Sequence, residues 1–70
     1  HKPYKLKIKT EIADVFSIEE GKLEKIGTIK KGETIDSAIL TYVSEVKDHL
    51  WFYREEKIDK YIKVDDTDWQ

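Results

Sequence analysis

Cysteine and methionine are both absent from this chain of 70 residues, proline occurs once, and glycine occurs three times. Without cysteine the chain forms no disulfide and offers no thiolate ligand to a metal ion. That absence suits a reducing cytosol and an extracellular surface equally well, so it leaves the compartment open. Seventy residues make one small domain, which buries only about 60% of the surface of its unfolded chain.

Long apolar runs are missing too, so the sequence contains neither a membrane-spanning segment nor a signal peptide. The first residue is His1 and not an initiator methionine, and this histidine could be the remnant of a tag. We therefore expect an excised piece of a longer chain, with any export signal elsewhere on that parent. Residues 1–3 and 66–70 are expected to be loose ends.

Charge of both signs is abundant: charged residues make up 40% of the chain, with 13 basic and 15 acidic residues and a net charge of −2. The two signs are interspersed along the chain, except for a basic N-terminus and an acidic C-terminus, and interspersed charge is typical of a solvated surface. Nucleic-acid backbones are bound through clustered lysine and arginine. A net acidic chain is a poor match, so no nucleic-acid partner is expected.

The hydrophobic pattern predicts strands. Residues 4–9 alternate strictly, with Tyr4, Leu6 and Ile8 on one side and lysines on the other. The next stretch, residues 11–22, fits either a short strand or one helical turn before a turn at Gly21. Residues 24–29 read as a short strand, and residues 30–33 as a tight turn.

The second half of the chain is rich in β-branched and aromatic residues. Residues 35–43 are apolar on both faces, as in a strand of a small barrel, and a helix over residues 35–46 is the alternative. "KDHL" reads as a turn, "LWFYR" as a strand, "EEKIDK" as a charged hairpin loop and "YIKV" as the closing strand. The pattern predicts an all-β fold, a small barrel of five or six short antiparallel strands.

Three consecutive aromatic residues set the face of the aromatic strand. In a strand, Trp51 and Tyr53 share one face and Phe52 takes the other. We expect Phe52 to be core, which leaves Trp51 and Tyr53 outside as a binding surface. The alternative is that Trp51 only covers apolar surface at the barrel rim. The expected core is Leu6, Ile8, Ile26, Ile35, Ile39, Phe52 and Ile62.

No catalytic site is expected, because no serine is paired by a motif with either histidine, and the neighbouring carboxylates belong to turns. No metal site is expected either, since Asp65, Asp66 and Asp68 lack the turn glycine of a calcium loop. His49 beside Asp48 reads as a turn residue. The sequence implies no cofactor.

Three stretches, with a fourth that can stand for the first strand and loop, resemble the SH3-like domains of Gram-positive bacteria and their phages. "KIGTIKKGETI" is similar to their strand, diverging turn and strand, "WFYR" to their aromatic strand, "KYIKVDD" to their closing strand, and "IKTEIADVFS" to their first strand and loop. The sequence departs from that family in having no N-x-R-x-G-P loop segment and no Gly-Trp dipeptide, and Lys60 stands where glycine is usual.

The resemblance implies a non-catalytic module that holds a surface protein or peptidoglycan hydrolase at the cell wall. Its ligand would be a wall glycan or peptide, bound in an aromatic groove of Trp51, Tyr53, Tyr61 and Phe16. The alternative is an SH3-like protein-interaction module, or a small stand-alone phage-type protein, with a peptide or protein partner. The resemblance also implies an extracellular or cell-surface location; the sequence leaves the oligomeric state open.

Overall fold

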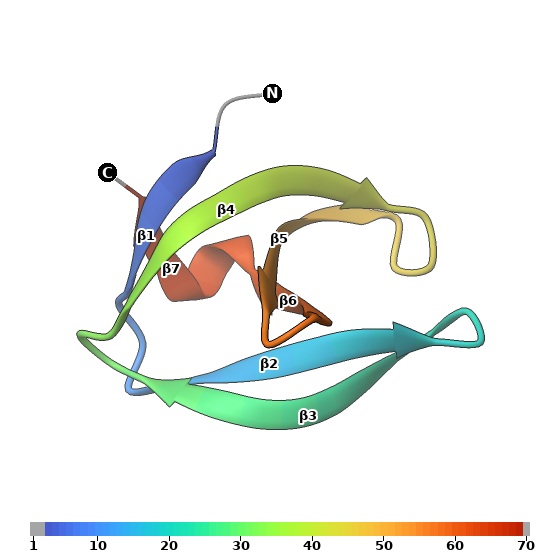
Figure 1. The fold of residues 1–70 in the computed structure, drawn as a ribbon, viewed down its shortest axis with the longest axis horizontal. Helices are drawn as coiled ribbons and strands as arrows, with labels where there is room; N and C mark the ends of the chain where they lie inside the picture. Colours follow the sequence, from blue (N-terminus) through green and yellow to red (C-terminus); the bar gives the residue numbers. More distant parts are fainter. Residues whose placement is uncertain (1–2, 70) are drawn as a thin grey trace.

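A computed structural model describes residues 3–69, with only the backbone described at residue 69 (Figure 1). It contains seven strands and one short 3-10 turn. In chain order these are β1 (Tyr4–Ile8), β2 (Ile12–Glu19), β3 (Lys22–Lys30), β4 (Thr34–Val43), β5 (Asp48–Glu55), β6 (Ile58–Lys63), η1 (Val64–Asp66) and β7 (Thr67–Trp69). The all-β, small-domain prediction is confirmed. The described residues include no helix long and apolar enough to cross a membrane.

The strands form one curved antiparallel sheet in the order β3-β2-β6-β5-β4-β1-β7. Its two ends, β3 and β7, do not pair with each other within the described chain. The sheet therefore curls without closing into a barrel, and it has one or two strands more than expected. A closed barrel would leave no free strand edge, whereas here β3 and β4 separate where β4 leaves the turn at residues 31–33 (Figure 1).

Strand β4 is apolar on both faces because it joins two parts of the sheet. Its first half pairs with β1, with Leu6 opposite Ile35, and its second half pairs with β5, with Leu40 opposite Trp51. The helical alternative for this segment is therefore wrong, and residues 11–22 likewise form strand and turn. Pairing along ten residues satisfies backbone groups that a helix would have satisfied internally.

Left-handed backbone at the turns fixes the strand boundaries. Glu20 and Gly21 have φ of 50° and 76°, and Glu56 and Lys57 have φ of 52° and 64°, so both hairpins close with two-residue turns. The "EEKIDK" loop is thus shorter than expected. The turn predicted at "KDHL" is misplaced, since the loop spans residues 44–47 and β5 begins at Asp48.

The C-terminal segment is part of the sheet. Residues 61–64 were expected to form the closing strand, but residues 61–63 belong to β6, which lies between β2 and β5, and Val64 begins η1. The chain then turns through η1, and β7 pairs with β1, with Asp68 opposite Lys7. The amide of Lys9 also donates to the carbonyl of Asp66 at 3.0 Å. Residues 66–69 are therefore not loose, while residues 1, 2 and 70 lie outside the described residues.

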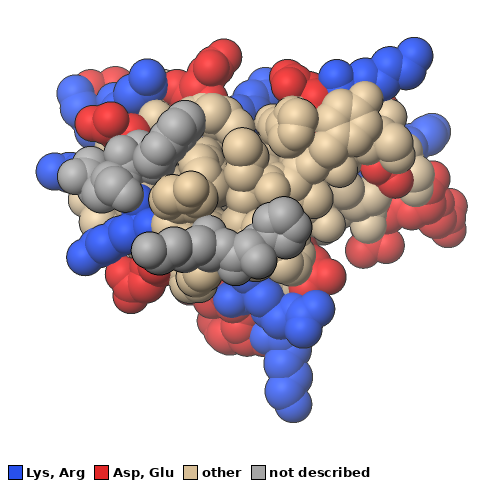
Figure 2. Space-filling view, turned by 90° about the horizontal axis from the view of Figure 1, so that it is seen from above, with Lys and Arg blue, Asp and Glu red and all other residues tan. Residues whose placement is uncertain are grey.

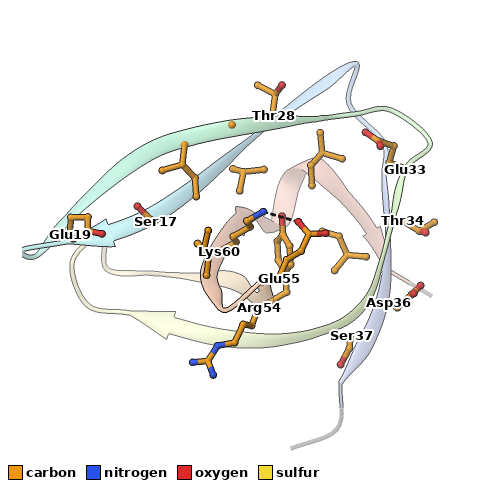
Figure 3. A pocket seen from close by; sticks show the side chains of 17 residues that line it. Ser17, Glu19, Thr28, Glu33, Thr34, Asp36, Ser37, Arg54, Glu55 and Lys60 are labelled. Atoms are coloured by element: carbon orange, nitrogen blue, oxygen red, sulfur yellow. Dashed lines mark hydrogen bonds and ion pairs between the residues drawn. The ribbon is translucent and has the colours of Figure 1, made fainter.

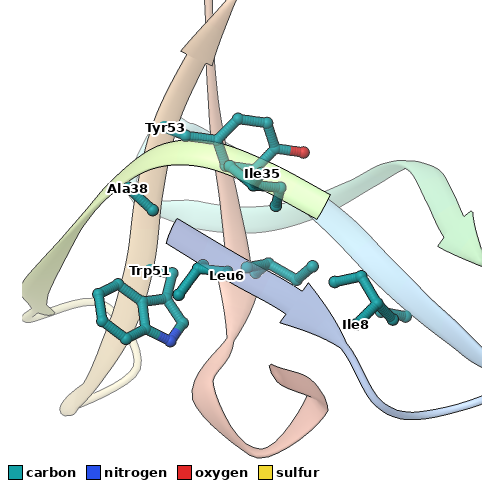
Figure 4. Packing of buried hydrophobic residues seen from close by; sticks show 8 residues of the cluster. Leu6, Ile8, Ile35, Ala38, Trp51 and Tyr53 are labelled. Atoms are coloured by element: carbon teal, nitrogen blue, oxygen red, sulfur yellow. The ribbon is translucent and has the colours of Figure 1, made fainter. Parts of the chain in front are cut away.

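The core lies on the concave side of the sheet. Its buried members are Leu6, Ile8, Ala13, Ile35, Ala38, Trp51, Tyr53 and Ile62 (Figure 4). The indole N–H of Trp51 donates to Thr67 Oγ1 at 3.0 Å, and the Thr67 hydroxyl donates to the carbonyl of Val64 at 2.8 Å. This chain of bonds ties β5 to η1 and β7.

Four of the seven expected core residues are buried: Leu6, Ile8, Ile35 and Ile62. The other three are corrections. Phe52 is half-buried on the convex face, because β5 has the opposite phase to the expected one. Ile39 is half-buried on the same face, because the pairing of β4 with β1 shifts in register between Ile35 and Ala38. Ile26 is 46% exposed because the register of β2 and β3 shifts around it, which leaves it without a cross-strand partner.

Candidate functional site

The four residues expected to form one aromatic groove lie on two faces of the sheet. Trp51 and Tyr53 are core residues, only 1% and 7% exposed, so the expectation that they point outward is wrong. Phe16 and Tyr61 are half-buried on the convex face. The cause is the register, which places Trp51 opposite Ile62 and Phe52 opposite Tyr61.

The length of the turn between β5 and β6 decides this register. A hairpin closed by the two-residue turn Glu56-Lys57 pairs Trp51 with Ile62. Ile62 was already assigned to the core, and residues directly opposite each other in a sheet share a face. Reading "EEKIDK" as a long loop removed that constraint and left the phase of β5 open.

Across the convex face runs a cross-strand line of apolar residues, which we call the outer row. It consists of Ile39, Phe52, Tyr61 and Phe16, opposite one another in β4, β5, β6 and β2. All four are half-buried. The rings of Phe52 and Tyr61 have centroids 5.4 Å apart and are tilted by 50°. Lys63 Nζ lies 5.7 Å from the centroid of the Phe16 ring.

The phenol of the outer row is a hydrogen-bond donor at neutral pH, as tyrosine ordinarily is. The pKa of Tyr61 is raised, first by partial burial and then by the carboxylates of Asp59 and Glu45. Lys63, at one end of the row, adds a single positive charge beside the rings. The outer row thus combines ring surface, one donor and one cation.

An apolar groove of about 420 Å³ borders the outer row, and we call it the hairpin groove. It is lined by Leu23, Leu40, Val46, Asp48, His49, Leu50, Lys63, Val64 and Asp65. Leu50 and Lys63 pair with each other and follow the Phe52–Tyr61 pair on the same face, so this part of the lining adjoins the row. Leu40 lies opposite Trp51 and lines the groove from the other face of β4. Leu40 and Val46 are 42% and 38% exposed.

Surface charge leaves a broad neutral area on the side of the molecule formed by β4. Figure 2 shows uncharged residues (tan) across the middle of this face, with lysines and acids around its margin. Strand β4 explains the pattern, since Asp36 is its only charged residue. Tyr42 is 56% exposed there and makes an edge contact with His49, at 5.3 Å between ring centroids. His49 is thus a strand residue in a ring contact and not a turn residue.

A larger hollow, of about 970 Å³, lies where β3 and β4 separate, and we call it the seam (Figure 3). Val15, Ile29, Ile35 and Tyr53 contribute apolar surface to its lining. Lys60 Nζ donates to Glu55 Oε1 at 2.7 Å in the middle of the opening.

The phenol of Tyr53 stays protonated beside this opening. Its pKa is raised to about 12, mainly by burial and secondarily by Glu55. Within residues 3–69, no three side chains of His, Asp or Glu cluster closely enough to hold a metal ion. The surfaces that the structure offers are therefore an aromatic row, an apolar groove and an open seam.

Comparison of the chain with protein-family models, with curated proteins and with solved structures finds no significant match.

Proposed function

We propose that the chain is a non-catalytic SH3-like binding module that anchors a larger surface protein or a peptidoglycan hydrolase to the bacterial cell wall. The strand path supports the SH3-like part of the proposal. A first strand is followed by a long hairpin, β2–β3, then by three sequentially paired strands, β4, β5 and β6. A 3-10 turn and a short last strand beside β1 complete the path. The cell surface is the corresponding location.

The observation that carries the wall-binding proposal is the outer row. Phe16, Tyr61 and Phe52 lie side by side on one face and remain partly accessible to solvent. Aromatic rings offer a large contact area with few rotatable bonds to immobilise, so a shallow surface binds sugar rings or apolar side chains usefully. The Tyr61 hydroxyl adds a donor for a glycan hydroxyl or a peptide carbonyl.

Charge selects among the polymers of the wall. The chain has a net charge of −2, and Lys63 is the cation in contact with the outer row. Lys5 and Lys7 belong to β1, which two strands separate from β6 in the sheet. A polyanion such as teichoic acid therefore meets little positive charge at the row. A neutral glycan or a stem peptide is the ligand that we propose.

Sedimentation with purified Gram-positive walls tests this function. We expect the parent protein to pellet with walls before and after extraction of teichoic acid, and Tyr61→Ser to remain largely in the supernatant. Tyr42→Ser is the matched control, because Tyr42 is an exposed tyrosine outside the outer row. Both variants must first show the parent's circular dichroism. Walls from several species that leave the folded parent in the supernatant would exclude the wall-binding function.

The hairpin groove favours a second candidate, a module that binds a protein partner. Leu40 and Val46 expose apolar side chains beside a groove whose lining includes Leu23, Leu50 and Val64. Grooves of this kind accept apolar side chains of a peptide. Leu40→Ser would weaken capture of a protein partner and leave wall sedimentation unchanged. If the wall is the ligand, Tyr61→Ser would instead weaken wall sedimentation and leave capture of a protein partner unchanged.

A further inference from the structure

We propose that the seam binds an extended peptide segment carrying lysine or arginine, which adds to the free edge of β3 as a further strand. This surface is distinct from the outer row and goes beyond wall binding. Strand β3 is the last strand at one end of the sheet and is nine residues long. An edge strand presents alternate N–H and C=O groups without partners, which an extended chain can pair with.

The shape of the seam leaves room for such a strand. Residues 26–29 of β3 form one wall and residues 33–37 form the other. A side chain added at Gly27 would meet no atom within 4 Å, so the backbone there is open to an approaching chain. Ile26, 46% exposed, and the buried Ile35 offer apolar contacts on opposite walls.

The charge of the seam selects a cationic segment. Its lining contains four carboxylates and two cations: Glu19, Glu33, Asp36, Glu55, Arg54 and Lys60. Both cations are already paired, Arg54 with Asp59 at 2.6 Å and Lys60 with Glu55 at 2.7 Å. Glu19 and Asp36 have no ion-pair partner within residues 3–69. A lysine or arginine of the added strand would supply one.

A second copy of this chain fits the same edge less well. Strand β3 carries Lys22, Lys25 and Lys30 against a single acid, Glu24. Two antiparallel copies of β3 would bring like charges together across the new ladder, which is unfavourable. A separate segment whose lysines or arginines all face the seam avoids most of this repulsion, because Lys25 and Lys30 lie opposite Phe16 and Ile12 on the convex side. Such a segment is the occupant.

Fluorescence anisotropy with a labelled peptide of about eight residues, alternating lysine and valine, tests the proposal. We expect saturable binding that is lost when glutamate replaces lysine, and also when alternate peptide nitrogens are methylated to block strand pairing. Gly27→Val, which places a side chain in the opening, should weaken binding by about tenfold or more. Glu19→Gln with Asp36→Asn should weaken it by roughly fivefold.

The matched control is Asp65→Asn, which removes an exposed acid that lines the hairpin groove and not the seam. It should leave the anisotropy curve unchanged. No binding of the lysine peptide, equal binding of its methylated form, or equal loss with Asp65→Asn would each overturn the proposal. So would self-association of the chain that Gly27→Val abolishes, since it would make a second copy the occupant.

These experiments test wall binding and peptide binding at the seam independently of each other. Gly27→Val should still sediment with cell walls, and Tyr61→Ser should still bind the lysine peptide, because the two residues lie on opposite faces of the sheet. The methylated peptide requires no protein variant, so its result does not depend on whether a substitution disturbs the fold.

Discussion

The two faces of strand β5 both carry large aromatic residues, which are buried on one face and partly exposed on the other. On the concave face Trp51 is 1% exposed and lies edge-on to Tyr4, with ring centroids 5.7 Å apart. On the convex face Phe52 is half-buried and contacts Tyr61. The concave face is closed by β1, η1 and β7, whereas no element of the described chain covers the convex row (Figure 1).

Hydrogen bonding explains why the tryptophan takes the buried face. A buried indole N–H needs an acceptor, because an unpaired donor in a core is costly. Thr67 provides that acceptor and passes a further bond to Val64. Phe52 has no polar atom and tolerates partial exposure. Trp51 is thus held by packing and by a polar anchor, whereas Phe52 and Tyr61 remain partly accessible to solvent.

Truncation of the two faces should give the largest contrast. Trp51→Ala removes a fully buried ring and its hydrogen bond and should cost about 3–5 kcal/mol of the free energy of unfolding. Phe52→Ala removes a half-exposed ring and should cost about 1–2 kcal/mol. Urea unfolding measures both, and in a domain of this size the first variant should be largely unfolded. Equal losses for the two variants would contradict the assignment of faces.

The polar anchor can be broken alone. Thr67→Val keeps the volume of the side chain but removes the acceptor of the Trp51 N–H and the donor to the carbonyl of Val64. We expect a loss of about 1–3 kcal/mol in urea unfolding. Thr67→Ser, which keeps the hydroxyl, is the control and should lose less. A Thr67→Val variant as stable as the parent would show that packing alone positions Trp51.

The turn between β5 and β6 should be open to improvement. Glu56 and Lys57 both adopt left-handed φ values without being glycine, which costs energy for residues with a Cβ. The pair Asn-Gly is suited to this two-residue turn. Glu56→Asn with Lys57→Gly should stabilise the fold by about 1 kcal/mol and raise the Tm without altering wall sedimentation. An unchanged or lower Tm for this double variant would count against the turn geometry. As a comparison, Gly32→Ala places a Cβ at a φ of 91° and should lower the Tm.

The smallest effect concerns pH. The pKa of Tyr53 is raised from 10.0 to about 12 in the folded chain, chiefly by burial. Below pH 10 both the folded and the unfolded chain keep the proton, so stability is unaffected by this group. Between pH 10 and about pH 12 only the unfolded chain releases it, so stability falls. In that window the free energy of unfolding of Tyr53→Phe, measured by chemical unfolding, should fall less steeply with pH than that of the parent. Equal slopes for the two proteins would show that Tyr53 is in contact with water.

Several features of the chain follow from local chemistry. Strict alternation in residues 4–8 specifies a half-buried strand, and β1 has its apolar Leu6 and Ile8 in the core as expected. Glycine at residues 21 and 32 marks two turns that require positive φ. The β-rich composition and the absence of a long helical period specify the all-β class. Each of these features depends only on residues that are close together in the sequence, so it can be predicted without knowing which strands pair.

Other features depend on which strands meet. Because Trp51, Phe52 and Tyr53 are all aromatic, alternation does not tell which of them face the core. Only the pairing of Trp51 with the buried Ile62 places Trp51 and Tyr53 on the core side of β5. Likewise, residues 66–70 were expected to be a loose end, but residues 67–69 pair with the edge of β1. Ile26 belongs to an apolar pattern and is exposed only because of the irregular register of β2 and β3.

The sequence by itself therefore determined the class of fold, the first strand and two turns. Tertiary structure decided the phase of β5, the open seam and the identity of Phe52 as the third ring of the outer row. The physical reason is that alternation has a period of two, so a strand shifted by one residue has an equally regular pattern on the opposite face. Only contacts between distant strands, such as Trp51 with Thr67, distinguish the two.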